Sequence, residues 1–461
     1  MSERVYAHFI GIGGAGMSGI ARVLHDRGVA VTGSDLKGSR YSQALSAIGV
    51  PVTIGHDAGN LGDPEVVVIS SAIPDGNPEL AAARERGIPV WPRAKMLAHL
   101  AGELSTVAVA GTHGKTTTSS MVATMFDNMT LDPTFLIGGE VDGFGTNARC
   151  GAGPHYVVEA DESDGSFVFL TPEVAVVTNI EADHLDHYGT LAAVEKTFAE
   201  FMCRVPSEGS LVVWADDDRL MEIASECGAR VVSYGCAANA DVRCHSLVRA
   251  GQGHTFTIAL PNGDEVDCRI DVPGEHNVWN AAASLATAFA LGLDVEEAAR
   301  ALEGFSGVRR RFDHIGAADG VTVVDDYAHH PTEVRATLAA ARTAGHERVW
   351  VVFQPHRYSR TEALSVDFGE AFGDADRVVL MDVYGAGETP VPGVSGKTLV
   401  DSILLHNPRA RVTYLPHRAE LTPYLASELR SGDLVMTMGA GDVTALGPEI
   451  VREISARAEA V

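Results

Sequence analysis

The feature that most constrains the fold is a repeated pattern along the chain. A short apolar, β-branched run is followed by a polar or glycine-rich turn and then by an alanine-rich segment of helical period, as in EVVVISSA, STVAVAGTHGK, EVAVVTNIEADH and RVWVVFQPHR. Such alternation is typical of parallel sheets built from βα units. The pattern therefore predicts an α/β fold. In nearly every repeat the chemically active residues directly follow the strand, where ligands of open α/β sheets bind.

The length of the chain sets the number of domains. It has 461 residues, and domains commonly hold roughly 100 to 200 residues, so we expect three. We predict a Rossmann-like domain over residues 1–104, a central parallel-sheet domain with a phosphate loop over 105–306, and a Rossmann-like α/β domain over 307–461. Between about residues 237 and 271, alternation and the turn PNGDE predict a small antiparallel accessory sheet.

Composition excludes several classes of partner. The net charge is −26, from 61 acidic and 35 basic residues, which argues against nucleic acid or an anionic membrane as the main partner. The N-terminus MSERVYAHFIGIGG has no signal-peptide pattern, and no apolar run approaches the ~18 residues of a membrane span. The six cysteines form no C-x-x-C pair, so we expect reduced thiols. These features predict a soluble cytoplasmic enzyme, monomeric or weakly dimeric.

Two glycine loops predict two phosphate-binding sites. The first, GIGGAG, follows an apolar strand, and Asp35 comes nineteen residues after Gly16, near the spacing at which an acidic residue meets a ribose. By itself this loop favours an NAD-dependent oxidoreductase. The alternatives are a site for another diphosphate nucleotide and a tight turn with a purely structural role. Its residues are Gly11, Gly13, Gly14, Ala15, Gly16 and Met17.

The second loop, GTHGKT, changes that balance, because hydride transfer has no use for it. It lies between a predicted strand and a predicted helix. Its backbone amides can cradle phosphates, Lys115 can reach the β- and γ-phosphates, and the Thr116 hydroxyl can bind Mg²⁺. Its residues are Gly111, Thr112, His113, Gly114, Lys115, Thr116 and Thr117.

Acidic and polar residues after the next two strands predict a magnesium site. Oxygen-rich ligand sets suit Mg²⁺, although a solvated acidic turn that caps a helix is an alternative explanation of DHLDHY. The candidate ligands are Glu159, Asp161, Glu162, Asn179, Asp183, His184, Asp186 and His187.

Several further motifs occur in one order along the chain. GTHGKTTT, VEADESD, TNIEADHLDHYG, HNVWNAAAS, GVRRRFD, DDYAHHPTEV and QPHRYSR together resemble the Mur ligases, and specifically the branch that adds L-alanine. The resemblance runs from Gly11 to about Asp442. It implies a cytoplasmic step of peptidoglycan synthesis, in which ATP, UDP-N-acetylmuramate and L-alanine give UDP-N-acetylmuramoyl-L-alanine, ADP and phosphate. One loop would hold the UDP diphosphate and the other ATP.

The resemblance also implies residue roles. For the UDP-sugar it adds Asp35, His56, Ser70 and Ser71 to the first glycine loop. For ATP it adds Asn277, Asn280, Arg309, Arg310 and Asp326 to the second. For the metal it implies Thr116, Glu159 and His184, with Mg²⁺ as cofactor beside ATP. For the amino acid it implies Tyr327, His329, Arg357 and Arg360, and the predicted catalytic residues are Lys115, Glu159, His184 and Arg357.

The sequence departs from the pattern of the sister ligases that add later amino acids. Those enzymes carry a carbamylated lysine about fourteen residues after the histidine that matches His184, where this chain has Phe198. We therefore predict no carbamylated lysine. Three alternatives stay open: a ligase that recycles an intact peptide onto the same sugar nucleotide, an NAD-dependent oxidoreductase, and a phosphate-loop regulator. Three domains that each contribute a substrate contact also lead us to expect domain closure.

Overall fold

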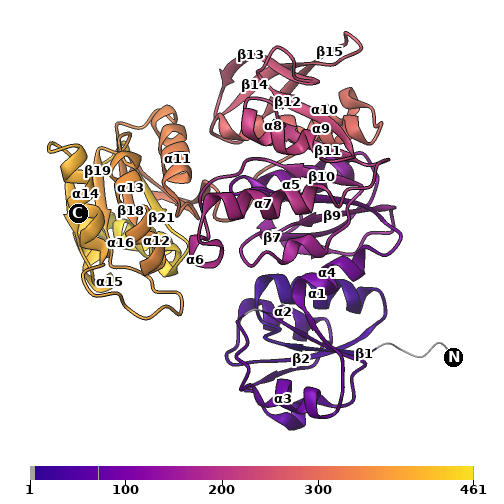
Figure 1. The fold of residues 1–461 in the computed structure, drawn as a ribbon. Coiled ribbons are helices and arrows are strands. Elements are labelled where there is room, and N and C mark those ends of the chain that lie inside the picture. Colours follow the sequence, from indigo (N-terminus) through magenta and orange to yellow (C-terminus); the bar gives the residue numbers. More distant parts are fainter. Residues whose placement is uncertain (1–5, 71, 460–461) are drawn as a thin grey trace. The chain divides into compact units, whose positions relative to one another are not determined.

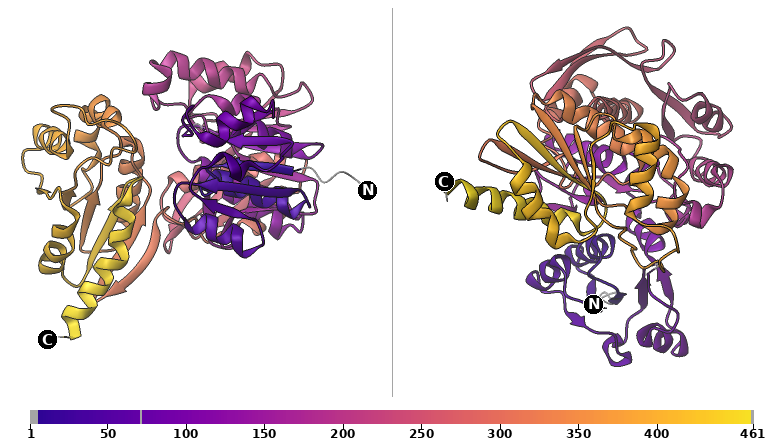
Figure 2. Two further views of the ribbon diagram at one scale, coloured as in Figure 1. Left: turned by 90° about the horizontal axis from the view of Figure 1, so that it is seen from below. Right: turned by 90° about the vertical axis from the view of Figure 1, so that its left-hand side faces the viewer.

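The computed structural model describes residues 6–70 and 72–459, and their contacts divide the chain into two compact units. The first unit runs to Val248 and adds Thr255–Ile270 and Trp279–Phe305. The second holds Arg249–His254, Asp271–Val278 and the chain from Ser306 onward. Figure 1 and Figure 2 show the α/β architecture that the βα repeats predict. The boundaries at residues 104 and 306 stay predictions.

A five-stranded parallel sheet forms the start of the first unit, in the order β3-β2-β1-β4-β5. The order reverses between β1 and β4, which is where open α/β sheets bind ligands. Its strands are β1 (Tyr6–Ile10), β2 (Ala30–Asp35), β3 (Val52–Ile54), β4 (Val66–Ile69) and β5 (Val90–Pro92). Its helices are α1 (Ala15–Asp26), α2 (Arg40–Ala47), η1 (Ala58–Leu61), α3 (Pro78–Glu85) and α4 (Arg93–Ala101).

A ten-stranded sheet forms the rest of the first unit, in the order β15-β14-β13-β12-β11-β10-β6-β9-β7-β8. Its inner strands are parallel and nearly all apolar and buried, as expected of a sheet covered on both faces. The strands are β6 (Ser105–Ala110), β7 (Thr134–Val141), β8 (Thr146–Arg149), β9 (His155–Glu159), β10 (Val174–Val177), β11 (Ser210–Trp214), β12 (Arg230–Gly235), β13 (Val242–Ala250), β14 (Gly253–Ala259) and β15 (Glu265–Ile270). The expected accessory strands are thus β13, β14 and β15, which extend this sheet at one edge.

Helices cover the ten-stranded sheet and join it to the first sheet. Gly19 of α1 lies against Leu136 of β7 and Ala148 of β8, and the Asn147 side chain donates to the Ala15 carbonyl at 3.1 Å. The helix that follows the first glycine loop therefore packs on the second sheet (Figure 1). The helices are α5 (Lys115–Asn128), η2 (Ser166–Phe169), α6 (Leu185–Tyr188), α7 (Leu191–Met202), α8 (Asp218–Ser225), α9 (His276–Ala290) and α10 (Val295–Leu302).

The second unit contains a six-stranded sheet in the order β16-β17-β21-β18-β19-β20, parallel except for the edge strand β16. Apolar cores lie around its strands, with Phe353 and Trp350 fully buried on β18. The strands are β16 (Asp313–Ala318), β17 (Val321–Asp326), β18 (Arg348–Phe353), β19 (Arg377–Leu380), β20 (Val412–Tyr414) and β21 (Asp433–Met438). The helices are α11 (Pro331–Thr343), α12 (Tyr358–Ala363), α13 (Ser365–Ala371), α14 (Gly396–His406), α15 (Arg418–Glu428), η3 (Asp442–Ala445) and α16 (Leu446–Glu459).

One expectation from composition is wrong for two of the six cysteines. Cys203, just after α7, and Cys227, just after α8, form a disulfide. Spacing along the sequence gave no sign of this pair, because the two helices bring together residues 24 positions apart. The other four cysteines lie outside this disulfide. None of the helices formed by residues 6–70 and 72–459 combines the length and apolar composition needed to cross a bilayer.

Candidate active site

The first glycine loop connects β1 to α1 at the carboxyl edge of the five-stranded sheet. Gly11 has a φ of +83°, and the Gly13 amide donates to Asp35 Oδ2 at 2.9 Å. A Cβ on Gly13 would lie 2.9 Å from that same oxygen, so the close approach requires glycine. Asp35, predicted as a ribose contact, thus also fixes the loop.

The other residues predicted for the UDP-sugar lie at the same edge. His56 follows β3 and Ser70 follows β4, and the Ser70 hydroxyl lies 3.7 Å from the position of a Cβ on Gly11. Gly14 precedes α1, Ala15 and Gly16 form its first turn, and Met17 is buried. Ser71 lies outside the described residues. The structure therefore places Asp35 and Ser70 against the loop that leads into the amino end of α1, a position that favours anions.

Sequence reasoning missed a cation beside this loop. A guanidinium nitrogen of Arg93, the first residue of α4, lies 2.7 Å from the position of a Cβ on Gly16. The same guanidinium forms an ion pair with Asp161 at 2.9 Å. Burial would raise the pKa of Asp161, but Arg93 and Lys115 lower it from 3.8 to about 2. Arg93 directly follows the short strand β5, which sequence reasoning did not single out, so only the fold reveals its position.

The second glycine loop connects β6 to α5 and is held by the chain that follows β10. The Thr112 amide donates to the Asn179 carbonyl at 3.0 Å, and the His113 amide donates to Asn179 Oδ1 at 2.9 Å. Gly111 and Gly114 have φ values of +134° and +82°, and a Cβ on either would clash, with Thr178 or Asn280. Asn179, considered above as a magnesium ligand, supports the loop backbone.

The order of the strands explains why the acidic motifs meet this loop. In the sheet, β6 lies between β10 and β9 and is parallel to both. The loops after all three strands therefore share one edge. Lys115 and Thr116 begin the helix that follows β6, Glu159 to Glu162 lie at and after the end of β9, and Thr178 to His184 follow β10.

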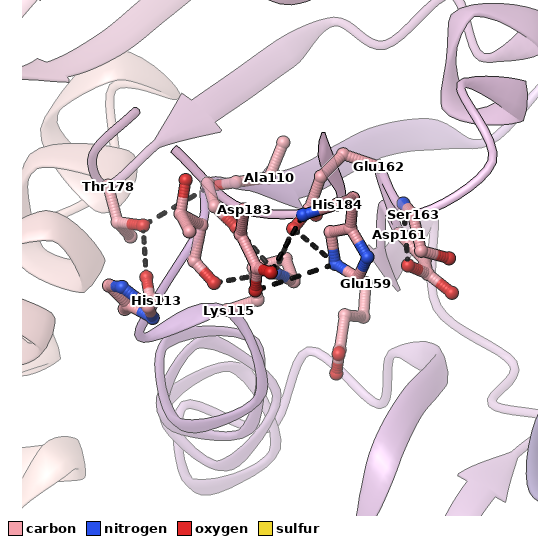
Figure 3. A network of polar contacts seen from close by, with 12 residues as sticks. Ala110, His113, Lys115, Glu159, Asp161, Glu162, Ser163, Thr178, Asp183 and His184 are labelled. Carbon is pink, nitrogen blue, oxygen red and sulfur yellow. Dashed lines mark hydrogen bonds and ion pairs between the residues drawn. The ribbon is translucent and has the colours of Figure 1, made fainter. Parts of the chain in front are cut away.

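Lys115 is anchored within this cluster (Figure 3). Its ammonium donates to Glu162 Oε1 at 2.8 Å and to the carbonyls of Gly111 and Thr112 at 2.5 and 3.0 Å. Glu162 is 2% exposed, and its other oxygen, Oε2, is buried without a hydrogen-bond partner among the described residues. Sequence reasoning placed Glu162 near the metal, but not as the partner of the loop lysine.

The pKa values of Lys115 and Glu162 are both raised. Burial would lower the pKa of Lys115, but Glu162, Asp161 and Glu159 raise it above its usual value. Burial raises the pKa of Glu162 to about 7, against the opposing charge of Lys115. The lysine is therefore positively charged at neutral pH.

The residues predicted to bind magnesium lie around this pair. Thr116 Oγ1 donates to Glu159 Oε1 at 3.0 Å, and Glu159 Oε2 accepts the Gly138 amide at 2.7 Å. His184 Nε2 lies 3.8 Å from Glu162 Oε1 (Figure 3). This set of hydroxyl and carboxylate oxygens, with an unpartnered buried Glu162 oxygen, fits a hard divalent cation. Asp183 is buried and its Oδ1 accepts the His184 amide, whereas Asp186 and His187 lie on the short helix α6.

The two asparagines predicted to contact adenine fall in different units. Asn280 belongs to the first unit, where its Oδ1 accepts from Thr118 at 3.1 Å and lies beside Gly114. Asn277 belongs to the second, where its Nδ2 donates to the Pro273 carbonyl at 2.7 Å. Helix α9 thus begins in one unit and continues in the other.

In the second unit, the three consecutive arginines before β16 differ in their surroundings. Arg310 donates through Nε to the buried Asp325 at 3.2 Å and through Nη2 to the Gly439 carbonyl at 2.7 Å. The Arg309 side chain is 51% exposed. Arg311, which sequence reasoning did not single out, forms an ion pair with Glu333 at 3.5 Å and lies over the Tyr327 ring. Arg310 therefore has a structural role, because it binds the buried Asp325 and the Gly439 carbonyl.

Asp326 ends β17 and is buried. Its carboxylate accepts the Phe312 amide at 2.7 Å and the Ala328 amide at 2.8 Å. Burial raises its pKa to about 6, although Arg311 and the two amides oppose the shift. The two backbone amides thus hold Asp326, the predicted ribose contact, in place.

The residues predicted for the amino acid are partly brought together. The rings of Tyr327 and His329 lie edge to face at 5.2 Å, and His329 lies 5.7 Å from His356, which sequence reasoning missed. Arg360 is buried on α12 and its Nη1 lies 3.4 Å from His356 Nδ1. Arg357 precedes α12 with a φ of +67°.

Comparison with protein families gives three matches in order along the chain. Residues 6–104 match the model described as Mur ligase family, catalytic domain. Residues 109–288 match the Mur ligase middle domain, and residues 310–441 match the model described as Mur ligase, glutamate ligase domain.

Individual relatives match over nearly their whole length. The chain is 49% identical to the UDP-N-acetylmuramate–L-alanine ligase of Saccharopolyspora erythraea, over 98% of this chain and 93% of that protein. It is 50% identical to the enzyme of that name from Rubrobacter xylanophilus, over 97% of this chain and 99% of that protein. Among solved structures, the UDP-N-acetylmuramate–alanine ligase of Thermotoga maritima matches with a TM-score of 0.81 and 29% identity, over 98% and 99%. A murein peptide ligase from Psychrobacter arcticus shares the fold, with a TM-score of 0.74 and 24% identity, over 98% and 99%.

Proposed function

The chain belongs to the Mur ligase family, and from that premise we propose that it joins L-alanine to the lactyl carboxylate of UDP-N-acetylmuramate while ATP is converted to ADP and phosphate. The observation that carries the proposal is identity of 45 to 50% over nearly the full length with several L-alanine ligases. A role in peptidoglycan precursor synthesis, in the cytoplasm, follows from that reaction.

The proposed reaction has two steps. A lactyl carboxylate oxygen bonds to the γ-phosphorus of ATP and ADP leaves, which gives an acyl phosphate. The alanine nitrogen then bonds to the acyl carbon, inorganic phosphate leaves, and the amine loses a proton. Phosphoryl transfer of this kind depends mainly on positioning and on neutralising charge.

The residues of the second glycine loop supply that positioning. The charged Lys115 would move from Glu162 to the β- and γ-phosphates, and the amide groups at the start of α5 would hold the phosphate oxygens. Thr116, Glu159 and His184 would hold Mg²⁺, and Glu162 Oε2 supplies a further oxygen beside them. The metal, when bound, would neutralise the two anions that must meet.

The other substrates would bind around the remaining residues. The first glycine loop, Asp35, His56 and Ser70 support a UDP-diphosphate site, to which Arg93 adds a cation. Asn277, Asn280, Arg309 and Asp326 are proposed for the rest of ATP, and Arg310 for phosphate only in addition to its structural bonds. Tyr327, His329, Arg357 and Arg360 are proposed for L-alanine, whose carboxylate suits a guanidinium.

The experiment that tests the proposal measures phosphate release from ATP with Mg²⁺ and UDP-N-acetylmuramate. L-alanine, L-serine, glycine, a tripeptide or no amine is supplied in parallel. We expect release that requires both the sugar nucleotide and an amine, fastest with L-alanine. Preference for the tripeptide would assign the chain to the peptide-recycling branch, and release without the sugar nucleotide would contradict ligase activity.

A further inference from the structure

A buried carboxylate connects the elements that form the first glycine-loop site. Glu79 of α3 is fully buried. Its Oε2 accepts from His8 Nε2 at 2.9 Å and from Ser34 Oγ at 2.6 Å, and its Oε1 accepts from the Asp57 amide at 3.1 Å and from Asn60 Nδ2 at 2.9 Å. These four donors come from β1, from β2 and from the segment after β3.

Glu79 is an acceptor only. Burial would raise its pKa, but hydrogen bonds from His8, Ser34 and Asn60 outweigh burial and lower the pKa from 4.5 to about 2. The carboxylate is therefore ionised at neutral pH, and each group that contacts it directs a proton towards it.

This arrangement determines which nitrogen of His56 carries the proton. Because Ser34 directs its hydroxyl proton to Glu79, the Ser34 oxygen is left to accept from His56 Nδ1, 2.9 Å away. His56 Nδ1 also lies 3.4 Å from Glu79 Oε1, a second acceptor. In the neutral imidazole the proton is thus on Nδ1, and Nε2 is an acceptor.

The His56 side chain is 9% exposed and lies at the edge where the predicted site lies. No described residue forms a hydrogen bond with His56 Nε2. The Ser34 carbonyl accepts the Gly11 amide at 2.8 Å, and Asp35 binds the Gly13 amide. The cluster around Glu79 is therefore connected directly to the first glycine loop.

We propose that Glu79 is a positioning residue for recognition of the nucleobase, because it fixes His56 with Nε2 as an acceptor for the imide N3–H of uracil. Cytosine has an unprotonated ring nitrogen at that position, so two acceptors would face each other and one would lose its partner. The inference rests on the proposed UDP-sugar substrate and deepens it, since it names the group that distinguishes a uridine from a cytidine nucleotide.

The protonation of His56 can be observed without any assay of activity. Histidine labelled with ¹⁵N is incorporated into the full chain, and the His56 signals are assigned by their loss in His56→Gln. At pH 8 we expect Nδ1 to carry the proton and Nε2 to be bare. A proton on Nε2 in place of Nδ1 would overturn the proposal.

Steady-state kinetics then test whether Glu79, by positioning His56, affects recognition of the uracil base. We compare the wild type with Glu79→Gln, with Ser34→Ala, and with the control Glu85→Gln, an exposed glutamate on the same helix. In both cluster variants we expect KM for UDP-N-acetylmuramate to rise about tenfold, with kcat and KM for ATP within about twofold of wild type. The preference for UDP over CDP as inhibitors should fall about tenfold, and Glu85→Gln should match the wild type.

The outcomes separate this inference from the proposed function. If the wild type turns over UDP-N-acetylmuramate but both variants keep their KM and their preference for UDP, the inference is wrong and the function stands. An equal rise in KM for ATP would show a general structural effect and would also overturn it. If the wild type does not use UDP-N-acetylmuramate, the proposed function fails. Should Glu79→Gln not fold, Ser34→Ala carries the test, because it leaves the carboxylate in place.

Discussion

At the scale of single residues, the second glycine loop depends on one charged side chain. Lys115 is held by Glu162 and by two loop carbonyls, so its ammonium lies where phosphates would bind. Phosphoryl transfer needs that charge, whereas the UDP-sugar is proposed to bind at the other glycine loop, after β1.

The change Lys115→Ala should therefore lower kcat by at least about 10²-fold. The Kd for UDP-N-acetylmuramate, measured by calorimetry without ATP, should stay within about twofold of wild type, because the glycine loop after β1 is untouched. Lys196→Ala, an exposed lysine on α7, is the control and should behave as wild type. Normal ATP-dependent turnover in Lys115→Ala would show that the role assigned to this lysine is wrong.

Arg310 and Arg309 are neighbours with different expected effects. Arg310→Ala leaves the buried Asp325 without its guanidinium partner, so the free energy of unfolding of the second unit should fall by roughly 2–4 kcal/mol. Arg309→Ala removes an exposed side chain and should change that free energy by less than about 0.5 kcal/mol. Urea unfolding measures both, and equal stability of the two variants would argue against a structural role for Arg310.

The pKa of Glu79 predicts a dependence of stability on pH. Its folded pKa of about 2 lies below the ordinary 4.5, so its contribution is complete above pH 4.5 and is lost as the pH falls towards 2. The stability difference between wild type and Glu79→Gln should be about 1 kcal/mol smaller at pH 4 than at pH 7. Urea unfolding at both values measures it. A difference that grows at pH 4 would contradict the assigned ionisation.

At the scale of elements, the packing of α1 links the first glycine loop to the ten-stranded sheet. A Cβ on Gly19 would lie 2.8 Å from Leu136 Cδ2 and 3.1 Å from Ala148 Cβ. The helix can approach β7 and β8 this closely because position 19 has no side chain.

Gly19→Val should push α1 away from β7 and β8 and lower the free energy of unfolding by roughly 1–3 kcal/mol. Thermal unfolding followed by circular dichroism measures the effect. Gly38→Val is a matched control, because no atom lies within 4 Å of its Cβ position and its φ is not positive. Equal melting temperatures for the two variants would contradict the prediction, because they would show that a side chain at position 19 does not weaken the packing of α1 on β7 and β8.

The sequence predicted elements better than it predicted contacts. The glycine loops, Asp35 and the acidic strand ends were visible because each follows an apolar strand, and parallel strands put such residues at one edge. Arg93 and Arg311 were missed because their neighbours come from distant segments, and His356 was missed because the rings that it meets do. The pairing of Cys203 with Cys227 was missed for the same reason, as was the use of Asn179 to hold the His113 amide.

At the scale of the whole molecule, the predicted substrate contacts are distributed over both units. The first unit carries both glycine loops, the proposed metal ligands and Asn280, and the second carries Asn277, Asp326 and the residues proposed for the amino acid. Comparison with relatives over the whole chain extends the resemblance seen in the motifs to all three family models. We therefore expect ligation to require both units.

The most direct test of the account is the fate of the carboxylate oxygens. UDP-N-acetylmuramate labelled with ¹⁸O in both lactyl carboxylate oxygens is incubated with ATP, Mg²⁺ and L-alanine, and the products are analysed by mass spectrometry. We expect one ¹⁸O atom in the released phosphate and one in the new amide. Unlabelled phosphate would contradict activation of the carboxylate by phosphoryl transfer.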